Sequence, residues 1–142
     1  SLINRQDSIC VNKLIKILDK HGWVGKSRIG VQANQTFWLI IQHAELQVQE
    51  KYLPLLKKSV EKGESEGWHL AFLEDRILMC NKNEQLYGTQ VVWDNNLKKN
   101  KIYPISDIKS VNKRRKHLGL ESIEKYAKSN GYIFDQKNEL HD

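Results

Sequence analysis

The pattern of hydrophobic and polar residues at the start of the chain predicts an amphipathic helix. Its apolar residues recur at intervals of three and four: Cys10, Leu14, Ile17 and Leu18. Positions with this spacing share one helix face. We expect Asp7 to cap the helix at its amino end and Gly22 to stop it after His21. A loop over residues 22–30 then leads to the next element.

Two further helices are predicted in the stretch that follows. Residues 31–44 include the unbroken apolar run 37–41, which is apolar all round a helix rather than on one stripe. Such a helix is typical of a buried centre. Residues 47–62 form the next helix, in which Pro54 marks either a kink or the first turn of a separate helix.

Glycines at both ends of residues 63–67 break the helical pattern, and a fourth helix is predicted over residues 68–77. Its inward positions are Leu70, Leu73 and Ile77. Residues 76–80 could equally begin a strand, since a short apolar run fits both structures.

The pattern changes to a β-hairpin after residue 85. Residues 86–93 and 101–105 are rich in β-branched and aromatic side chains, and residues 94–96 supply turn chemistry. Ser106 is then expected to cap a helix that runs toward His117. A last short helix is predicted over residues 121–129, followed by Gly131.

The predicted fold is α+β, a mostly helical single domain with one β-hairpin. The chain of 142 residues, 16.6 kDa, is large enough to bury a core without disulfide or metal staples. We assign residues 1–134 to the domain and residues 135–142, which lack periodicity, to a frayed tail. No apolar run approaches the ~20 residues of a membrane span.

The two cysteines, Cys10 and Cys80, have neither a CxxC partner nor metal-ligand spacing, so we expect both to be small buried hydrophobes. No cofactor and no metal site is predicted. The chain begins at Ser1 without a signal peptide, which leaves the compartment open: cytoplasmic, or exported if a leader has been removed.

Three dense polar points stand out against this ordinary composition. One lies at the end of the apolar helix, one in the fourth helix and one before the hairpin. The residues with acid–base or anion-binding chemistry are His43, Asp75, Arg76 and Tyr87, and those suited to binding a polar ligand are Gln42, Gln85 and Gln90. We expect these side chains to converge on one site.

Each of these residues also has a purely structural interpretation. A buried histidine such as His43 can be satisfied by a main-chain carbonyl, and Asp75 with Arg76 can form a structural ion pair. The Tyr87-Gly88 pair can simply start a strand. Other histidines, His21, His69, His117 and His141, are assigned no role.

The net charge of +6 comes from one segment, because residues 94–128 hold ten Lys and Arg against four Asp and Glu. Its densest part is Lys113-Arg114-Arg115-Lys116-His117, which indicates either the solvated end of a helix or a phosphate-contacting patch. No nucleic-acid motif accompanies it, so we expect no nucleic-acid binding. Arg114 or Arg115 can instead turn inward toward a carboxylate such as Asp75 or Glu45.

Taken together, these residues resemble an uncharacterised bacterial domain-of-unknown-function family that shares the motifs WLIIQHA, LEDR and QxYGTQ. The resemblance covers nearly the whole chain. It is carried by Gly22-Trp23-Val24-Gly25, residues 38–44, residues 49–54, Leu73-Glu74-Asp75-Arg76, residues 85–90 and residues 112–120. The family implies no activity, substrate or cofactor.

Three functions remain open from the sequence. The first is a polar-ligand site with acid–base chemistry of the hydrolase type. The second is a non-catalytic protein-interaction module whose polar residues form a structural network. The third and weakest is binding of an anionic polymer through residues 109–117. The partner is accordingly an unknown small polar ligand or a protein.

Overall fold

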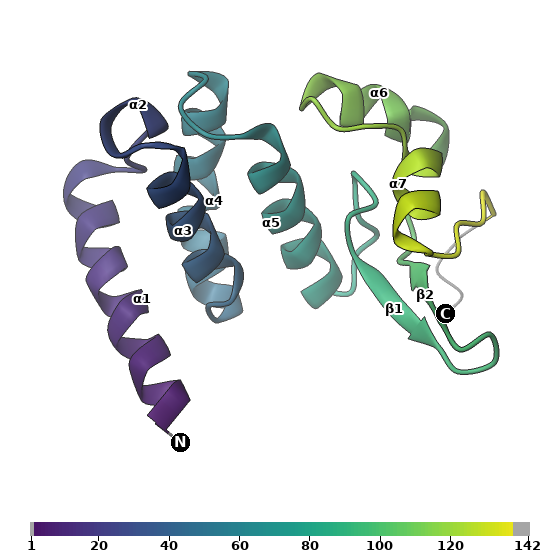
Figure 1. Ribbon diagram of the computed structural model, residues 1–142, viewed down its shortest axis with the longest axis horizontal. Coiled ribbons are helices and arrows are strands. Elements are labelled where there is room, and N and C mark those ends of the chain that lie inside the picture. Colours follow the sequence, from purple (N-terminus) through teal and green to yellow (C-terminus); the bar gives the residue numbers. More distant parts are fainter. Residues whose placement is uncertain (1, 138–142) are drawn as a thin grey trace. The chain divides into compact units, whose positions relative to one another are not determined.

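The computed structural model describes residues 2–137 of the chain (Figure 1). Helices and one antiparallel hairpin make up its regular structure, which confirms the predicted α+β class. Contacts within the chain group it into two compact units, Ser1–Leu70 and Ala71–Asp142, whose boundary falls inside helix α5 (Gly67–Cys80). The single domain over residues 1–134 stays a prediction, and residues 138–142 of the proposed tail lie outside the described part.

The first unit is built from helices. They are α1 (Leu2–His21), α2 (Lys26–Ile29), α3 (Val31–Gln42), α4 (Leu46–Glu61) and the start of α5. Helix α3 contacts α1, α2 and α4. The buried apolar side chains of these helices include Leu14, Leu18, Trp38, Ile41, Tyr52 and Leu56. Their spacing is the three-and-four pattern of an amphipathic helix.

Two predictions for the amino-terminal segment are wrong. Helix α1 begins before Asp7, so Asp7 lies inside the helix and does not cap it. The predicted loop over residues 22–30 contains the one-turn helix α2. The end of α1 is as predicted, because Gly22 adopts a φ of 70°, a conformation that costs glycine least, and its N–H bonds to Leu18 O.

Helix α3 is not buried all round, which corrects the prediction from the apolar run 37–41. Trp38 and Ile41 are buried, whereas Leu39 is 46% exposed. The neighbouring helices cover only part of its surface, so an apolar residue between two buried ones can still face water.

Helices α4 and α5 decide two open alternatives. Helix α4 continues through Pro54, which is exposed, so Pro54 does not lie in the first turn of a separate helix. Helix α5 runs to Cys80, so residues 76–80 do not begin a strand, and its predicted inward residues Leu70, Leu73 and Ile77 are buried. The cysteine prediction was wrong, because Cys10 and Cys80 are both exposed and free.

The second unit contains the predicted hairpin, although its strands are shorter than expected. Strand β1 (Val91–Asp94) pairs antiparallel with β2 (Lys99–Ile102), with Val91 opposite Ile102. The Asp94 carboxylate accepts hydrogen bonds from the N–H groups of Asn96 and Leu97, each at 2.9 Å, which closes the turn.

A one-turn 3-10 helix η1 (Ile108–Ser110), α6 (Val111–His117) and α7 (Ile123–Asn130) complete this unit. Ser106 therefore lies before the helical segment and does not cap it. The core consists of Ile102, Ile105, Val111, Ile123 and Ala127, with Val91 and Tyr126 packed against it. This core joins the hairpin to both carboxy-terminal helices and fixes the segment that precedes β1.

Candidate functional site

The predicted site residues are divided between the two units. Gln42 and His43 stand at the end of α3 in the first unit, whereas Asp75, Arg76, Gln85, Tyr87 and Gln90 belong to the second. That all of them share one site stays a prediction. Within the second unit, however, residues distant in sequence do come together around the segment 85–90, which we call the clamped loop.

Asp75 holds the clamped loop from helix α5. Its carboxylate is fully buried and accepts four hydrogen bonds. The donors are Leu86 N (2.8 Å), Tyr87 N (3.0 Å), Thr89 N (2.9 Å) and Thr89 Oγ1 (2.8 Å). Burial raises the pKa of Asp75, and these hydrogen bonds oppose the rise. The carboxylate thus satisfies loop N–H groups that would otherwise be buried without an acceptor.

Gln85 closes the loop on itself. Its side chain is fully buried, with Oε1 accepting from Gln90 N at 2.8 Å and Nε2 donating to Gln90 O at 3.0 Å. The same Nε2 donates to Tyr103 O at 2.7 Å. The Gln85 amide therefore pairs with both main-chain groups of Gln90, as a neighbouring strand would, and connects the loop to the chain that follows the hairpin.

Two arginines from α6 bind the carbonyl groups of the same loop. Arg115, only 1% exposed, donates from Nη1 to Tyr87 O and from Nε to Glu121 O, both at 2.6 Å. Arg114 donates from Nε to Leu86 O at 2.7 Å. Both arginines turn inward, as the sequence allowed, but these hydrogen bonds go to main-chain carbonyls.

Tyr126 also binds a carbonyl group of the clamped loop, because its hydroxyl donates to Thr89 O at 3.1 Å. The Arg115 guanidinium lies over the Tyr126 ring, 4.8 Å from its centroid. The basic cluster of the sequence is therefore partly built into the fold.

Gly88 is required by this arrangement. Its φ is 75°, and a Cβ at this position would collide with the side chains of Ile123 and Ile105. Any other residue at position 88 would adopt a strained backbone conformation and displace these two isoleucine side chains.

Tyr87, a predicted catalytic residue, lines a surface hollow in the second unit. The hollow is lined by Tyr87, Lys113, Arg114, Lys116 and His117. Burial, together with the nearby carboxylates of Glu74 and Asp75, raises the pKa of Tyr87 to about 12. Its phenol is consequently protonated at neutral pH and acts as a hydrogen-bond donor rather than a base.

His43 is exposed at the carboxy end of α3 and lines hollows together with Asp7, Cys10 and Glu45. Its exposure contradicts the structural interpretation in which this histidine is buried. Gln42 beside it is buried, and its main-chain carbonyl accepts from Gln49 Nε2 at 2.8 Å. Arg76 is half-buried.

His69 is the main residue that the sequence reasoning missed. It is fully buried in the first unit. Its ring stacks on that of Trp38, with 4.9 Å between the ring centroids, and lies edge-on to that of Trp68, with 4.2 Å between the centroids. Neither ring nitrogen finds a hydrogen-bond partner among the described residues, and burial lowers the pKa of His69 to about 4. Its spacing of four from the buried Leu73 was the signal that could have identified it.

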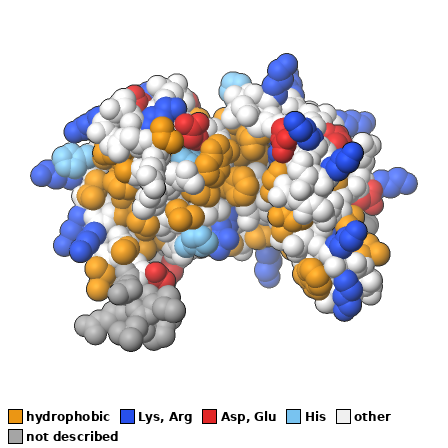
Figure 2. Space-filling model, viewed as in Figure 1, with side chains coloured by type: hydrophobic (Ala, Val, Ile, Leu, Met, Phe, Trp, Pro, Cys, Tyr) orange, Lys and Arg blue, Asp and Glu red, His pale blue; other side chains and the backbone are white. Residues whose placement is uncertain are grey.

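Within residues 2–137, no group of three or more His, Cys, Asp or Glu side chains is arranged to hold a metal ion. Helices in that part of the chain are too short or too polar to cross a membrane. On the face in Figure 2, Lys and Arg side chains are spread over the surface and do not form one continuous block.

Fold and site together define a small α+β protein in which buried polar side chains hold one loop before a hairpin. The model of the Family of unknown function (DUF6624) matches residues 2–137. The chain belongs to this family, which confirms the membership predicted from the motifs. No curated protein and no solved structure matches the chain.

Proposed function

We propose that the chain is a non-catalytic protein-interaction module, whose second unit binds an extended acidic segment of a partner along strand β1. The observation that carries the proposal is that the buried polar side chains of the second unit are hydrogen-bonded to the main chain. Asp75, Gln85 and Arg115 are all occupied in holding main-chain groups of the clamped loop. A rigid loop in front of an open strand suits binding rather than turnover.

Acid–base catalysis would need a group that can exchange a proton with a substrate. Asp75 is fully buried and already accepts four hydrogen bonds. Tyr87, with a pKa near 12, keeps its proton at neutral pH. Neither residue therefore favours a hydrolase-type mechanism in this unit.

Strand β1 offers unpaired main-chain groups along one edge. Ile102 of β2 lies opposite Val91, and its N–H points away from β1, because it donates to Ile133 O. The next residue, Tyr103, donates its N–H toward the other chain segment, to Gln90 O. Because hydrogen-bonding directions alternate along an antiparallel strand, the N–H and C=O of Val91 and Trp93 point away from β2. The described residues provide no partner for them on that side. An added strand would satisfy these groups, as in β-strand addition.

The side chains around this edge indicate the chemistry of the partner. Val92 is 42%, Trp93 56% and Leu97 59% exposed, so the tip presents apolar surface. The neighbouring positive charges are Lys98, Lys99 and Lys101, while the Asp94 carboxylate is used in the turn. An extended segment that alternates acidic and apolar residues complements both features.

The proposal can be tested with two octapeptides, one alternating Glu and Val and the other alternating Lys and Val. We expect the first to shift the amide resonances of Val91 and Trp93 saturably in ¹H–¹⁵N spectra, and the second to leave them unchanged. Trp93→Pro removes the outward N–H and should abolish the effect, whereas Val92→Thr, which retains the backbone donor, should preserve saturable binding. Equal shifts with both peptides, or none, would refute this function.

A second candidate, acid–base chemistry at His43, is favoured by one observation. The exposed imidazole lines hollows that also contain Asp7 and Glu45, which are groups able to orient it. The test is hydrolysis of a chromogenic ester by the protein and by His43→Ala. The interaction module predicts equal rates, and a tenfold loss in the variant would promote the catalytic alternative.

A further inference from the structure

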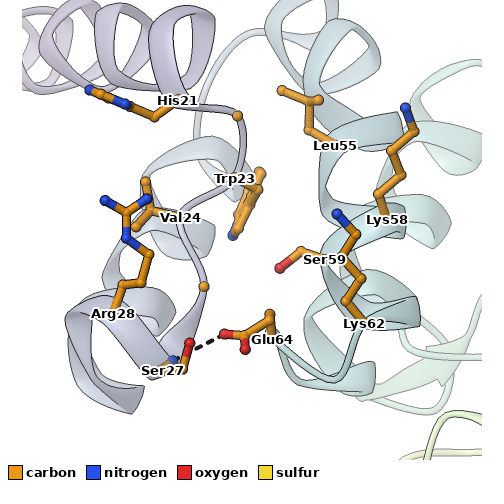
Figure 3. A pocket seen from close by; sticks show the side chains of 12 residues that line it. His21, Trp23, Val24, Ser27, Arg28, Leu55, Lys58, Ser59, Lys62 and Glu64 are labelled. Carbon is orange, nitrogen blue, oxygen red and sulfur yellow. Dashed lines mark hydrogen bonds between the residues drawn. The ribbon is translucent and has the colours of Figure 1, made fainter.

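A pocket in the first unit lies between two walls that are distant in sequence (Figure 3). One wall comprises the end of α1, the loop after it and α2, with Trp23 and Arg28. The other comprises α4 and the turn after it, with Lys58, Ser59 and Lys62. The pocket belongs entirely to this unit and shares no residue with the clamped loop or strand β1.

Two polar groups face the interior from buried positions. Trp23 is 8% exposed, and its indole N–H has no hydrogen-bond partner among the described residues. Ser59 is 5% exposed. Figure 3 shows the nitrogen edge of Trp23 and the hydroxyl of Ser59 pointing into the space between the walls. An unpaired buried N–H costs free energy, which a bound acceptor would recover.

The hydroxyl of Ser59 belongs to a buried chain of hydrogen bonds. Asn34 Nδ2 donates to Ser65 Oγ at 3.1 Å, and Ser65 Oγ lies 2.7 Å from Ser59 Oγ. Either hydroxyl can donate in this pair, and when Ser65 donates to Ser59, the Ser59 proton is available to a ligand in the pocket.

The charges around the pocket favour an anion. Arg28 stands on one wall and Lys58 and Lys62 on the other, against the single carboxylate of Glu64. That carboxylate is turned to Ser27, whose hydroxyl and N–H both hydrogen-bond to it, the N–H at 3.1 Å, and these hydrogen bonds lower the pKa of Glu64. Glu64 thus occupies the main-chain donor of Ser27, and the positive charges of the pocket are those of its side chains.

We propose that this pocket binds a small oxyanion, a phosphate or a carboxylate. The Trp23 indole and the Ser59 hydroxyl are its neutral donors, and Arg28 and Lys62 from opposite walls neutralise its charge. Bound anions bridge the α2 segment and the turn after α4.

The test is a titration with sodium phosphate and, separately, sodium acetate at constant ionic strength, followed by the indole N–H resonances. The Trp23 resonance is assigned with Trp23→Phe, and Trp38, Trp68 and Trp93 serve as internal references. We expect a saturable shift of Trp23 alone. Saturation by phosphate only identifies a phosphate site, and saturation by acetate identifies a carboxylate site.

Variants separate a built site from general charge attraction. Arg28→Ala or Lys62→Ala should raise the dissociation constant about tenfold or more, the effect of one charged hydrogen bond. Lys57 is an exposed lysine of α4 that does not line the pocket, and Lys57→Ala should change the dissociation constant by less than about twofold. No saturation with either anion, or equal losses in Lys62→Ala and Lys57→Ala, would overturn the proposal.

Discussion

The two units differ in how completely their buried polar side chains are hydrogen-bonded. In the second unit, Asp75, Gln85 and Arg115 are almost inaccessible. Asp75 and Gln85 each bond several main-chain groups of the clamped loop, and Arg115 bonds Tyr87 O of that loop and Glu121 O. In the first unit, His69 and Trp23 are buried with ring N atoms that have no partner among the described residues. The second unit uses buried polar side chains to fix the backbone of one loop. The first unit contains buried ring nitrogens without a partner among the described residues, beside the hydrogen-bonded Asn34, Ser59 and Ser65.

This difference separates structural from functional residues better than residue type does. A buried polar group with all its hydrogen bonds made within the chain stabilises the fold and has little capacity left for a ligand. A buried group that lacks a partner is costly, and a ligand or a change of pH can act on it. The predictions below test each side of the comparison.

The largest effect is expected for Asp75→Ala. The substitution leaves the N–H groups of Leu86, Tyr87 and Thr89 without their acceptor in a buried position. We expect the free energy of unfolding to fall by about 3 to 5 kcal/mol, as measured by urea denaturation. Glu121→Ala, which removes an exposed carboxylate of the same unit and a surface ion pair with Lys125, should change it by less than about 1 kcal/mol. A small effect of Asp75→Ala would break the comparison.

A slightly smaller loss is expected for Arg115→Ala. Its guanidinium bridges Tyr87 O and Glu121 O and lies over Tyr126, so both carbonyls lose a charged donor. We expect about 2 to 4 kcal/mol by urea denaturation. The adjacent, exposed Lys116 provides the matched control, and Lys116→Ala should change the stability by less than about 0.5 kcal/mol. Similar losses for both would mean that Arg115 is not part of the network.

The first unit should respond to pH through His69. Its pKa is about 4 in the folded state and about 6.5 in the unfolded state, so the unfolded chain takes up the proton first as the pH falls. The free energy of unfolding should therefore decrease between pH 6.5 and 4, by about 2 to 3 kcal/mol from this residue. Urea denaturation of the protein and of His69→Phe at several pH values in this range measures the decrease in the free energy of unfolding. An equally steep decrease in the variant would contradict the assignment.

The smallest effect is expected for nucleic-acid binding by the basic segment. Arg114 and Arg115 are bound to main-chain carbonyls, which leaves Lys109, Lys113 and Lys116 exposed. So few phosphate contacts predict weak binding with a shallow salt dependence. Titration of a generic duplex and a single strand at about 50 and 200 mM salt tests this. Micromolar affinity with a steep salt slope would restore the anionic-polymer function.

The sequence predicted the local structure well and the polar network only in part. Spacing identified the inward residues of α5, and glycine chemistry identified the end of α1. The hairpin followed from β-branched residues and the turn at Asp94. These features depend on neighbours in the chain, which pattern and turn chemistry describe.

What the sequence could not show is which partner each buried polar group finds. It placed Asp75 and the segment 85–90 in one cluster, but the donors to Asp75 are main-chain N–H groups that carry no signature. It allowed Arg115 to turn inward toward a carboxylate, whereas the structure gives it two carbonyls. Exposure of Leu39 and burial of His69 depend likewise on packing between helices.

The central claim, that Asp75 holds the loop before β1, is tested most directly by amide hydrogen exchange. We predict slow exchange for Leu86, Tyr87 and Thr89 in the native protein. In Asp75→Asn one oxygen can still accept from Leu86 and Tyr87, whereas an NH₂ donor replaces the acceptor of Thr89, so we predict selective acceleration of the Thr89 amide. The amides of Asn96 and Leu97, held by Asp94 in the exposed hairpin turn, should exchange rapidly in both proteins. Rapid exchange of the loop amides in the native protein, or unchanged protection in the variant, would contradict the account.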